Sequence, residues 1–141
     1  MKKEFRSTCI IASALDLIGD KWSLLIVRDM LMYKKKTFKD LAASDEGIAT
    51  NLLSSRLKLL ESLELLTKRK LPDNKKENIY LLTTKGIELA PMILEIVLWS
   101  DRYVREYNPT MNAFDGAGVD KAVVTESVQK DYEKFVAQTL G

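Results

Sequence analysis

Residues 48–61, IATNLLSSRLKLLE, place two different surfaces on one helix. When they are drawn at helical spacing, six leucines fall in one broad sector: Leu52, Leu53, Leu57, Leu59, Leu60 and Leu63. The opposite side carries short hydrogen-bonding side chains and a cation, with Glu61 at its edge: Thr50, Asn51, Ser54, Ser55, Lys58 and Ser62. The pattern predicts a helix that packs through its leucines and presents its polar face to a partner.

Two helices are predicted near the N-terminus. Residues 9–19 form a short helix that ends at Gly19. Residues 21–33 form a second helix, and the preceding Asp20 is placed to cap it.

A third short helix, residues 37–44, follows a basic turn formed by Lys34–Lys36. The connection SDEGIA, which contains Gly47, then leads into the polar-faced helix, and we expect Thr50 to cap that helix. A short helix, a tight turn and a second helix with two unlike faces predict a helix-turn-helix.

The spacing of apolar residues changes from helical to alternating after residue 64. Residues 65–71 and 78–84 are predicted strands, joined by the polar segment Pro72–Glu77. A hairpin directly after a helix-turn-helix is a wing. The polar face of the helix is then free to enter the major groove of DNA.

The rest of the chain predicts two further helices. Thr83 caps a long helix that reaches about Tyr107, with a kink or restart near Ala90 caused by Pro91. A linker, residues 108–118, separates it from an amphipathic helix over residues 120–140. The expected fold is mainly α with a small two-stranded β-wing, a winged helix-turn-helix with extra N- and C-terminal helices for dimerisation. We divide the chain into a DNA-binding and dimerisation domain, 1–107, and a linker with the C-terminal helix, 108–141.

The composition is that of a globular protein and argues against an enzyme. Of 141 residues, 46% are hydrophobic and 30% are charged, and no apolar run is long enough for a membrane span. The N-terminus lacks the features of a signal peptide, so we expect a cytosolic protein without membrane contact. The chain has no histidine, the commonest general base and metal ligand, and it lacks phosphate-binding loops and metal-ligand spacing. We therefore expect no enzymatic activity, no cofactor and no metal.

The positive charge is concentrated in the middle of the chain. Residues 34–85 hold twelve Lys or Arg against seven Asp or Glu, whereas residues 86–141 hold five against nine. A basic region before an acidic tail favours nucleic acid as a partner.

Several motifs together resemble the HxlR-type winged-helix transcriptional regulators. They are CIIASALDLIGDKWSLLIVRDML (9–31), Phe38, Leu41, Gly47-Ile48, Leu53, Arg56-Leu57-Lys58, Leu60-Glu61, Tyr80-x-Leu82-Thr83-x-x-Gly86 and Trp99. The resemblance covers about residues 9–104. It implies a cytoplasmic bacterial regulator that binds double-stranded operator DNA as a homodimer.

The chain departs from the family pattern at four positions. Ile10 replaces the usual proline, Asp20 a glycine and Ala49 the serine that caps the recognition helix. Glu64 stands where a glycine ends that helix, so it must adopt a left-handed backbone or the helix must end differently. The tail after residue 108 has no counterpart in the pattern.

The predicted DNA-binding residues form two groups. The recognition helix supplies Thr50, Asn51, Ser54, Ser55 and Lys58, for which the alternative is a solvated helix face. The wing and its flanks supply Lys68, Lys70, Lys75 and Lys76, with Lys75 and Lys76 expected at the wing tip.

Other charged and aromatic residues have open or structural interpretations. Arg56 lies inside the leucine sector, so an ion-paired structural role is favoured over DNA contact. The Lys34–Lys36 turn either solubilises the surface or clamps the DNA backbone. For Trp22, Trp99 and Tyr103 we favour the core or a dimer interface over a ligand pocket.

Cys9, the single cysteine, is a candidate redox sensor. Some regulators that resemble this chain use the cysteine at this position to sense oxidants or electrophiles. The neighbouring Lys2, Lys3 and Arg6 are cations of the kind that activate a thiol. The alternative is a plain small buried residue. A small-molecule or thiol-reactive effector is therefore a further candidate partner.

The expected assembly is a homodimer held by the first helix and the long helix, through a face with Leu89, Ile93, Ile96, Val97 and Trp99. The C-terminal helix should pack on this dimer through Val124, Val128, Tyr132, Phe135 and Val136. The operator should be an inverted repeat. The alternative function is a winged-helix module that binds another protein and no DNA.

Overall fold

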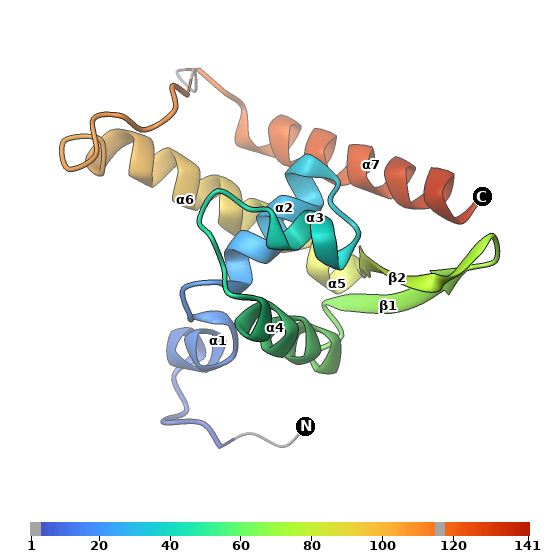
Figure 1. Ribbon diagram of the computed structural model, residues 1–141. Helices are drawn as coiled ribbons and strands as arrows, with labels where there is room; N and C mark the ends of the chain where they lie inside the picture. Colours follow the sequence, from blue (N-terminus) through green and yellow to red (C-terminus); the bar gives the residue numbers. More distant parts are fainter. Residues whose placement is uncertain (1–3, 115–117) are drawn as a thin grey trace.

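The computed structural model describes residues 4–114 and 118–141 of the protein. Helices surround one hydrophobic core, and a two-stranded antiparallel hairpin projects from it (Figure 1). The elements in order are α1 (Ile10–Ile18), α2 (Ser23–Tyr33), α3 (Phe38–Ala42), α4 (Thr50–Ser62), β1 (Leu66–Leu71), β2 (Asn74–Leu82), α5 (Thr84–Ile87), α6 (Ala90–Tyr103) and α7 (Lys121–Leu140). The mainly helical fold with a β-wing is confirmed.

The centre of the core is α2, because its side chains are buried on most sides. Val27, Met30 and Leu31 have no exposed surface. They belong to the same cluster as Leu53 and Leu60 of α4, which are also fully buried. Burying such side chains contributes about 1.5–3 kcal/mol each before conformational entropy is counted. The leucine side of α4 therefore packs as its spacing predicts.

The junction between α1 and α2 depends on Gly19 and Asp20. A Cβ atom on Gly19 would collide with the carbonyl group of Leu15, so only glycine fits this close approach. The Asp20 carboxylate accepts hydrogen bonds from the backbone N–H groups of Trp22 and Ser23, both at 3.0 Å. Asp20 therefore stabilises the start of α2, although the N-cap position itself is Trp22 and not Asp20 as predicted.

The helix-turn-helix comprises α3, a turn and α4. Thr37 caps α3, because its Oγ1 accepts the N–H of Asp40 at 3.0 Å. Gly47 in the turn has φ +70°, a left-handed conformation that glycine adopts without strain.

The prediction that Thr50 caps α4 is wrong. Thr50 is the first helical residue, and the N-cap is Ala49, whose backbone is extended and whose carbonyl accepts the N–H of Leu53 at 2.9 Å. The preceding Ile48 is buried in the core and so fixes where the helix begins. A side-chain cap is worth only about 1 kcal/mol, too little to move the start of α4 against that packing.

Glu64, just after α4, adopts a left-handed backbone conformation with φ 61°. This is the first of the two possibilities expected for a non-glycine residue at this position. The N–H of Leu65 reaches back to the carbonyl of Leu60 at 2.9 Å, which closes the helix in the manner of a Schellman motif. Lys85 Nζ donates to the carbonyl of Leu63 at 2.7 Å, so a cation lies at the negative end of the helix dipole.

The wing is longer than predicted on its second strand. β2 begins at Asn74 rather than at residue 78, and only Pro72 and Asp73 remain in the turn. Lys70 pairs with Asn78 but Leu71 pairs with Asn74, so residues 75–77 form an irregular bulge beside the turn. Lys75 and Lys76 thus lie in this strand next to the tip. These residues show no apolar alternation, so periodicity could not detect the strand.

The predicted long helix is two helices. Thr83 caps α5, as expected, because its Oγ1 accepts the N–H of Gly86 at 3.2 Å. The chain restarts at Ala90, with Pro91 in the first turn of α6, where its missing N–H removes no helical hydrogen bond. The restart near Ala90 is confirmed, but α6 ends at Tyr103 instead of Tyr107.

The C-terminal helix α7 packs on the rest of its own chain. Asp120 caps it, as its carboxylate accepts the N–H groups of Ala122 and Val123. Tyr132 is completely buried, and its hydroxyl oxygen accepts the N–H of Leu82 at 2.9 Å. Part of the predicted linker, residues 115–117, lies outside the described residues. Across the parts of the chain that are described, no helix combines the length and apolar character of a membrane span.

Candidate nucleic-acid interface

The polar face of α4 is open to solvent along the helix. Thr50, Asn51, Ser55 and Lys58 are exposed and Ser54 is half-buried, whereas the leucines behind them are buried or half-buried. Figure 1 shows α4 at the side of the molecule away from α7, with the β1–β2 hairpin continuing from its C-terminal end. All five predicted recognition residues therefore share one accessible surface.

The opposite side of α4 is tied to the start of α2 through Arg56. Arg56 Nε donates to Asp20 Oδ2 at 3.0 Å, which confirms the structural role predicted for this arginine. Burial alone would raise the pKa of the Asp20 carboxyl. Hydrogen bonds from the Ser23 hydroxyl and from the N–H groups of Trp22 and Ser23, together with the Arg56 charge, outweigh this effect and lower the pKa overall. The carboxylate is thus held ionised at the contact.

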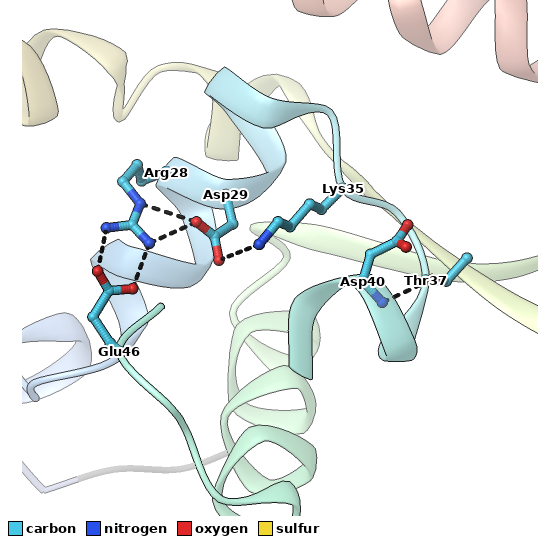
Figure 2. Close-up of polar contacts among 6 residues, drawn as sticks. All are labelled: Arg28, Asp29, Lys35, Thr37, Asp40 and Glu46. Atoms are coloured by element: carbon cyan, nitrogen blue, oxygen red, sulfur yellow. Dashed lines mark hydrogen bonds and ion pairs between the residues drawn. The ribbon is translucent and has the colours of Figure 1, made fainter. Parts of the chain in front are cut away.

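A second ionic network holds the turn that precedes α4 (Figure 2). Arg28 of α2 donates in a fork to Glu46, with NH1–Oε2 3.2 Å and NH2–Oε1 2.8 Å. The same guanidinium donates to Asp29 Oδ1, and Lys35 Nζ lies 3.5 Å from Asp29 Oδ2. The hydrogen bond from Arg28 lowers the pKa of Glu46, and that hydrogen bond in turn raises the pKa of Arg28.

This network fixes the approach of the chain to the recognition helix. Asp29 has 4% of its side chain exposed, so the carboxylate is buried and carries two cationic partners. A bidentate arginine–carboxylate pair restrains direction as well as distance. The turn at Glu46 is therefore held to α2 three residues before the N-cap Ala49.

The wing lysines Lys68, Lys70, Lys75 and Lys76 are all exposed. Among residues 4–114 and 118–141, neither these side chains nor Lys58 forms an ion pair. Their charge is not neutralised within the described part of the protein. Such cations are available to phosphate groups.

The basic turn Lys34–Lys36 is used mainly within the protein. Lys34 has φ 57° and its Nζ donates to the carbonyl of Leu31 at 3.2 Å. Lys35 pairs with Asp29, and Lys36 Nζ lies 5.8 Å from the centre of the Phe135 ring. These contacts give the turn a structural role.

The candidate sensor Cys9 is exposed at the N-cap position of α1, so the alternative of a buried cysteine is wrong. Its N–H donates to Ser7 Oγ at 3.2 Å, and its carbonyl accepts the Ser13 hydroxyl at 2.8 Å. Arg6, a predicted activating cation, forms an ion pair with Asp16. Lys2 and Lys3 lie outside the described residues.

The large aromatic residues divide between core and surface. Trp22 packs against the hydrophobic core, whereas Trp99 and Tyr103 on α6 are 61% and 50% exposed, with ring centres 5.8 Å apart. On α1, Ile10, Ile11 and Leu15 are also exposed. The protein thus presents apolar surfaces on α1 and α6, the two elements predicted to form a dimer.

The Arg28–Glu46 pair was missed by sequence reasoning. The two residues are 18 positions apart and lie on different elements, so no helical or strand spacing connects them. Their opposite charges were the only signal, and many other pairs in the chain share it. Within the described ranges no group of three or more metal-ligating side chains comes together.

Comparison with known proteins matches this arrangement to one family. Residues 17–108 match the model of the HxlR-like helix-turn-helix family. The HTH-type transcriptional regulator YodB of Bacillus subtilis is 35% identical over 91 residues, which cover 64% of this chain and 80% of YodB. An uncharacterized HTH-type transcriptional regulator of Mycobacterium tuberculosis is 33% identical over 67% of this chain, but the match spans only 58% of that relative.

Solved structures agree with the sequence matches. The transcription factor PA1607 has a TM-score of 0.62 at 32% identity, covering 81% of this chain and 73% of that one. The reduced form of YodB from B. subtilis has a TM-score of 0.58 at 34% identity, covering 69% of this chain and 95% of that one. A quinone-bound form of YodB has a TM-score of 0.56 at 30% identity, covering 68% of this chain and 100% of that one.

Proposed function

This chain belongs to the HxlR-like helix-turn-helix family of DNA-binding transcriptional regulators. We propose that it acts as a homodimer on an inverted-repeat operator. The observation that carries the proposal is the exposed polar face of α4 beside wing lysines that form no ion pair with any other described residue. The rival function, a module that binds only protein, has no comparable support.

In this proposal α4 lies in the major groove. Asn51, Ser54 and Ser55 contact base edges, because short side chains let the helix backbone approach the duplex closely. Ala49 has no side-chain oxygen to accept the first N–H groups of α4, so these groups are available to a phosphate. Thr50 lies beside them at the first helical position.

The cations surround this contact. Lys58 binds a phosphate at the edge of the groove, and Lys68, Lys70, Lys75 and Lys76 bind phosphates or the minor groove along the wing. The bulge at residues 75–77 displaces β2 next to the turn. The displaced part of the strand can then follow the DNA backbone. The two ionic networks hold the recognition helix and the turn that precedes it to α2 and its start.

The proposed dimer uses the exposed apolar residues of α1 and α6. Ile96, Val97 and Trp99 of α6 are exposed, as are Ile10, Ile11 and Leu15 of α1. The other expected members, Leu89 and Ile93, pack against the core of their own chain. Two such faces related by an axis would place two α4 helices on successive major grooves, about 10 bp apart or a multiple of that.

The experiment that tests the function is selection of random duplexes by the full chain, followed by titration of the enriched sequence. We expect an inverted repeat whose affinity falls steeply between 50 and 200 mM salt, the range over which phosphate contacts weaken. Titration of a scrambled duplex is the control. Equal affinity for enriched and scrambled DNA, or binding insensitive to salt, would contradict operator recognition.

We also propose Cys9 as the site at which a thiol-reactive effector acts. Its exposure at the start of α1 supports this, and so does the quinone-bound form of the relative YodB. Treatment with benzoquinone should change operator affinity of the parent and leave Cys9→Ser unchanged. An equal response of both proteins would exclude this thiol.

A further inference from the structure

A cavity of about 360 Å³ lies among α2, α6, α7 and residues 112–114. Figure 1 shows α7 running alongside α2 and α6, the elements that form its walls. The last turn of α2 contributes Met32 and Tyr33, α6 contributes Leu94, and α7 contributes Val124 and Val128. Phe114, from the segment after α6, is a further lining residue. The volume is that of a site for a small organic molecule.

The lining is apolar and carries no charge. None of the lining residues is Asp, Glu, Lys or Arg. The polar groups are Asn112 and Thr125 with the Tyr33 hydroxyl, so a bound molecule can form a few directed hydrogen bonds. A charged ligand would lose its hydration without a counter-charge, which is costly. The chemistry of the walls therefore selects an uncharged molecule.

A neighbouring cavity of about 330 Å³ has a different character. Its walls include Arg28, Asp101 and Arg105, together with Ile96 of the exposed α6 face. Arg105 already donates to Asp101 and to the carbonyls of Met111 and Asn112. Val97 of the proposed dimer face lines both cavities, but only the uncharged cavity extends to α7.

The uncharged cavity is completed by the part of this chain that the family model does not cover, which supplies six of its thirteen lining residues. The match ends at residue 108, and both α7 and residues 112–114 come after it. Tyr132 anchors α7 through its buried hydrogen bond to Leu82, so the outer wall is held in place without a ligand. The cavity is thus preformed, which lowers the cost of binding.

We propose that this cavity binds a small, uncharged, largely aromatic or aliphatic molecule with one or two hydrogen-bonding groups. The site is separate from the DNA surface, and its existence does not depend on the proposed operator. The wall of α2 leads directly to Lys36, whose carbonyl accepts the N–H of Tyr80 in β2 at 2.7 Å. A ligand here therefore contacts the element that connects to the wing.

The test uses the full chain and the uncharged fluorescent probe N-phenyl-1-naphthylamine. We expect saturable binding of one probe per chain, with a rise in fluorescence as the probe leaves water. Val124→Trp fills the cavity and should weaken binding by at least about tenfold, because overpacking displaces the ligand or strains the wall. Val123→Trp is the matched control, because Val123 is 61% exposed on the same helix and does not line the cavity.

The outcomes separate this site from the alternatives. Absence of saturable binding by the parent, or equal weakening by both variants, would overturn the proposal. Probe affinity that falls as protein concentration rises would show that a second copy occupies the cavity, which also overturns it. If thermal unfolding shows that Val124→Trp does not fold, Leu94→Trp tests the same cavity from α6. Operator titrations on each variant keep this result distinct from DNA binding, which should be unchanged.

Discussion

Arg56 of α4 donates to the same oxygen of Asp20 that accepts the N–H groups of Trp22 and Ser23 at the start of α2, with Nε–Oδ2 3.0 Å. One carboxylate thus closes the first turn of the central helix and fixes the back of the recognition helix. The Ser23 hydroxyl donates to the other oxygen at 2.5 Å, so both oxygens are occupied. The residue that departs from the family pattern at position 20 is therefore central to the geometry of the candidate DNA-binding face.

Removing the Asp20 carboxylate should destabilise the protein. Asp20→Ala should lower the free energy of unfolding by about 2 kcal/mol, because it removes the cap of α2 and leaves Arg56 without its partner. Arg56→Ala should lower the free energy of unfolding by less than Asp20→Ala does. Urea unfolding of both single variants and the double variant measures the coupling, which should be about 0.5–1 kcal/mol. Additive effects would mean that the two side chains do not interact in solution.

The Asp20 contact should also produce a pH dependence. Folding lowers the pKa of Asp20 from its ordinary value of 3.8. The stabilisation is therefore fully present at pH values above the pKa of the unfolded chain, and it is lost as the pH falls through the lower pKa of the folded protein. Asp20→Asn keeps a capping oxygen but removes the charge. The difference in melting temperature between parent and Asp20→Asn should therefore be largest near pH 7 and shrink below pH 3.8. A constant difference across this range would contradict the charge contribution.

Tyr132→Phe isolates the buried hydrogen bond between α7 and β2. The change leaves the N–H of Leu82 buried without its acceptor, so the free energy of unfolding should fall by about 1–3 kcal/mol. Tyr107→Phe is the control, since Tyr107 is 80% exposed and its loss should have little effect. Limited proteolysis provides a second measurement: the Tyr132→Phe protein should lose α7 faster than the parent.

The lysines should act on phosphates and the small polar residues on bases. Changing Lys58, Lys75 or Lys76 to Ala should weaken enriched and scrambled duplexes alike and lower the salt slope by about one unit. Asn51→Ala should alter preference at one base pair by about 1–3 kcal/mol. Lys130→Ala is the control, because that side chain pairs with Glu126 on α7. Parent-like binding by all of the α4 and wing variants would place the interface elsewhere.

The proposed dimer should depend on the apolar face of α6. Trp99→Asp places a charge in the interface and should convert a dimer into a monomer at micromolar concentration, as measured by sedimentation velocity. Val123→Asp, on the exposed side of α7, should remain dimeric. If the parent protein is a monomer, the proposed dimer is wrong. If Trp99→Asp is still a dimer, the dimer does not use this face of α6.

Most of the fold follows from periodicity and capping residues in the sequence. Leucine spacing identified α4, Asp20 and Thr83 marked helix starts, and Pro91 marked the restart at Ala90. These signals are local, because each acts within a few residues. Errors arose where a tertiary contact outweighed them: buried Ile48 set the start of α4, and backbone pairing extended β2 through a charged segment.

The candidate site was only partly predictable for the same reason. The exposed face of α4 follows from the position of its leucines, so its polar residues could be named from the sequence. The network of Arg28, Asp29, Lys35 and Glu46 joins elements that only the folded chain brings together. The cavity beside α7 likewise needs the packing of separate helices, and its apolar residues resemble any core.

The bond from Leu82 to Tyr132 has a consequence for biosynthesis. The two residues are 50 positions apart, and Tyr132 lies within α7, which is synthesised after both wing strands. The nascent chain makes the wing strands early, but the N–H of Leu82 gains its acceptor only once α7 has been made. On the ribosome the helix-turn-helix can therefore collapse first, while the core around Tyr132 forms only after α7 has been synthesised.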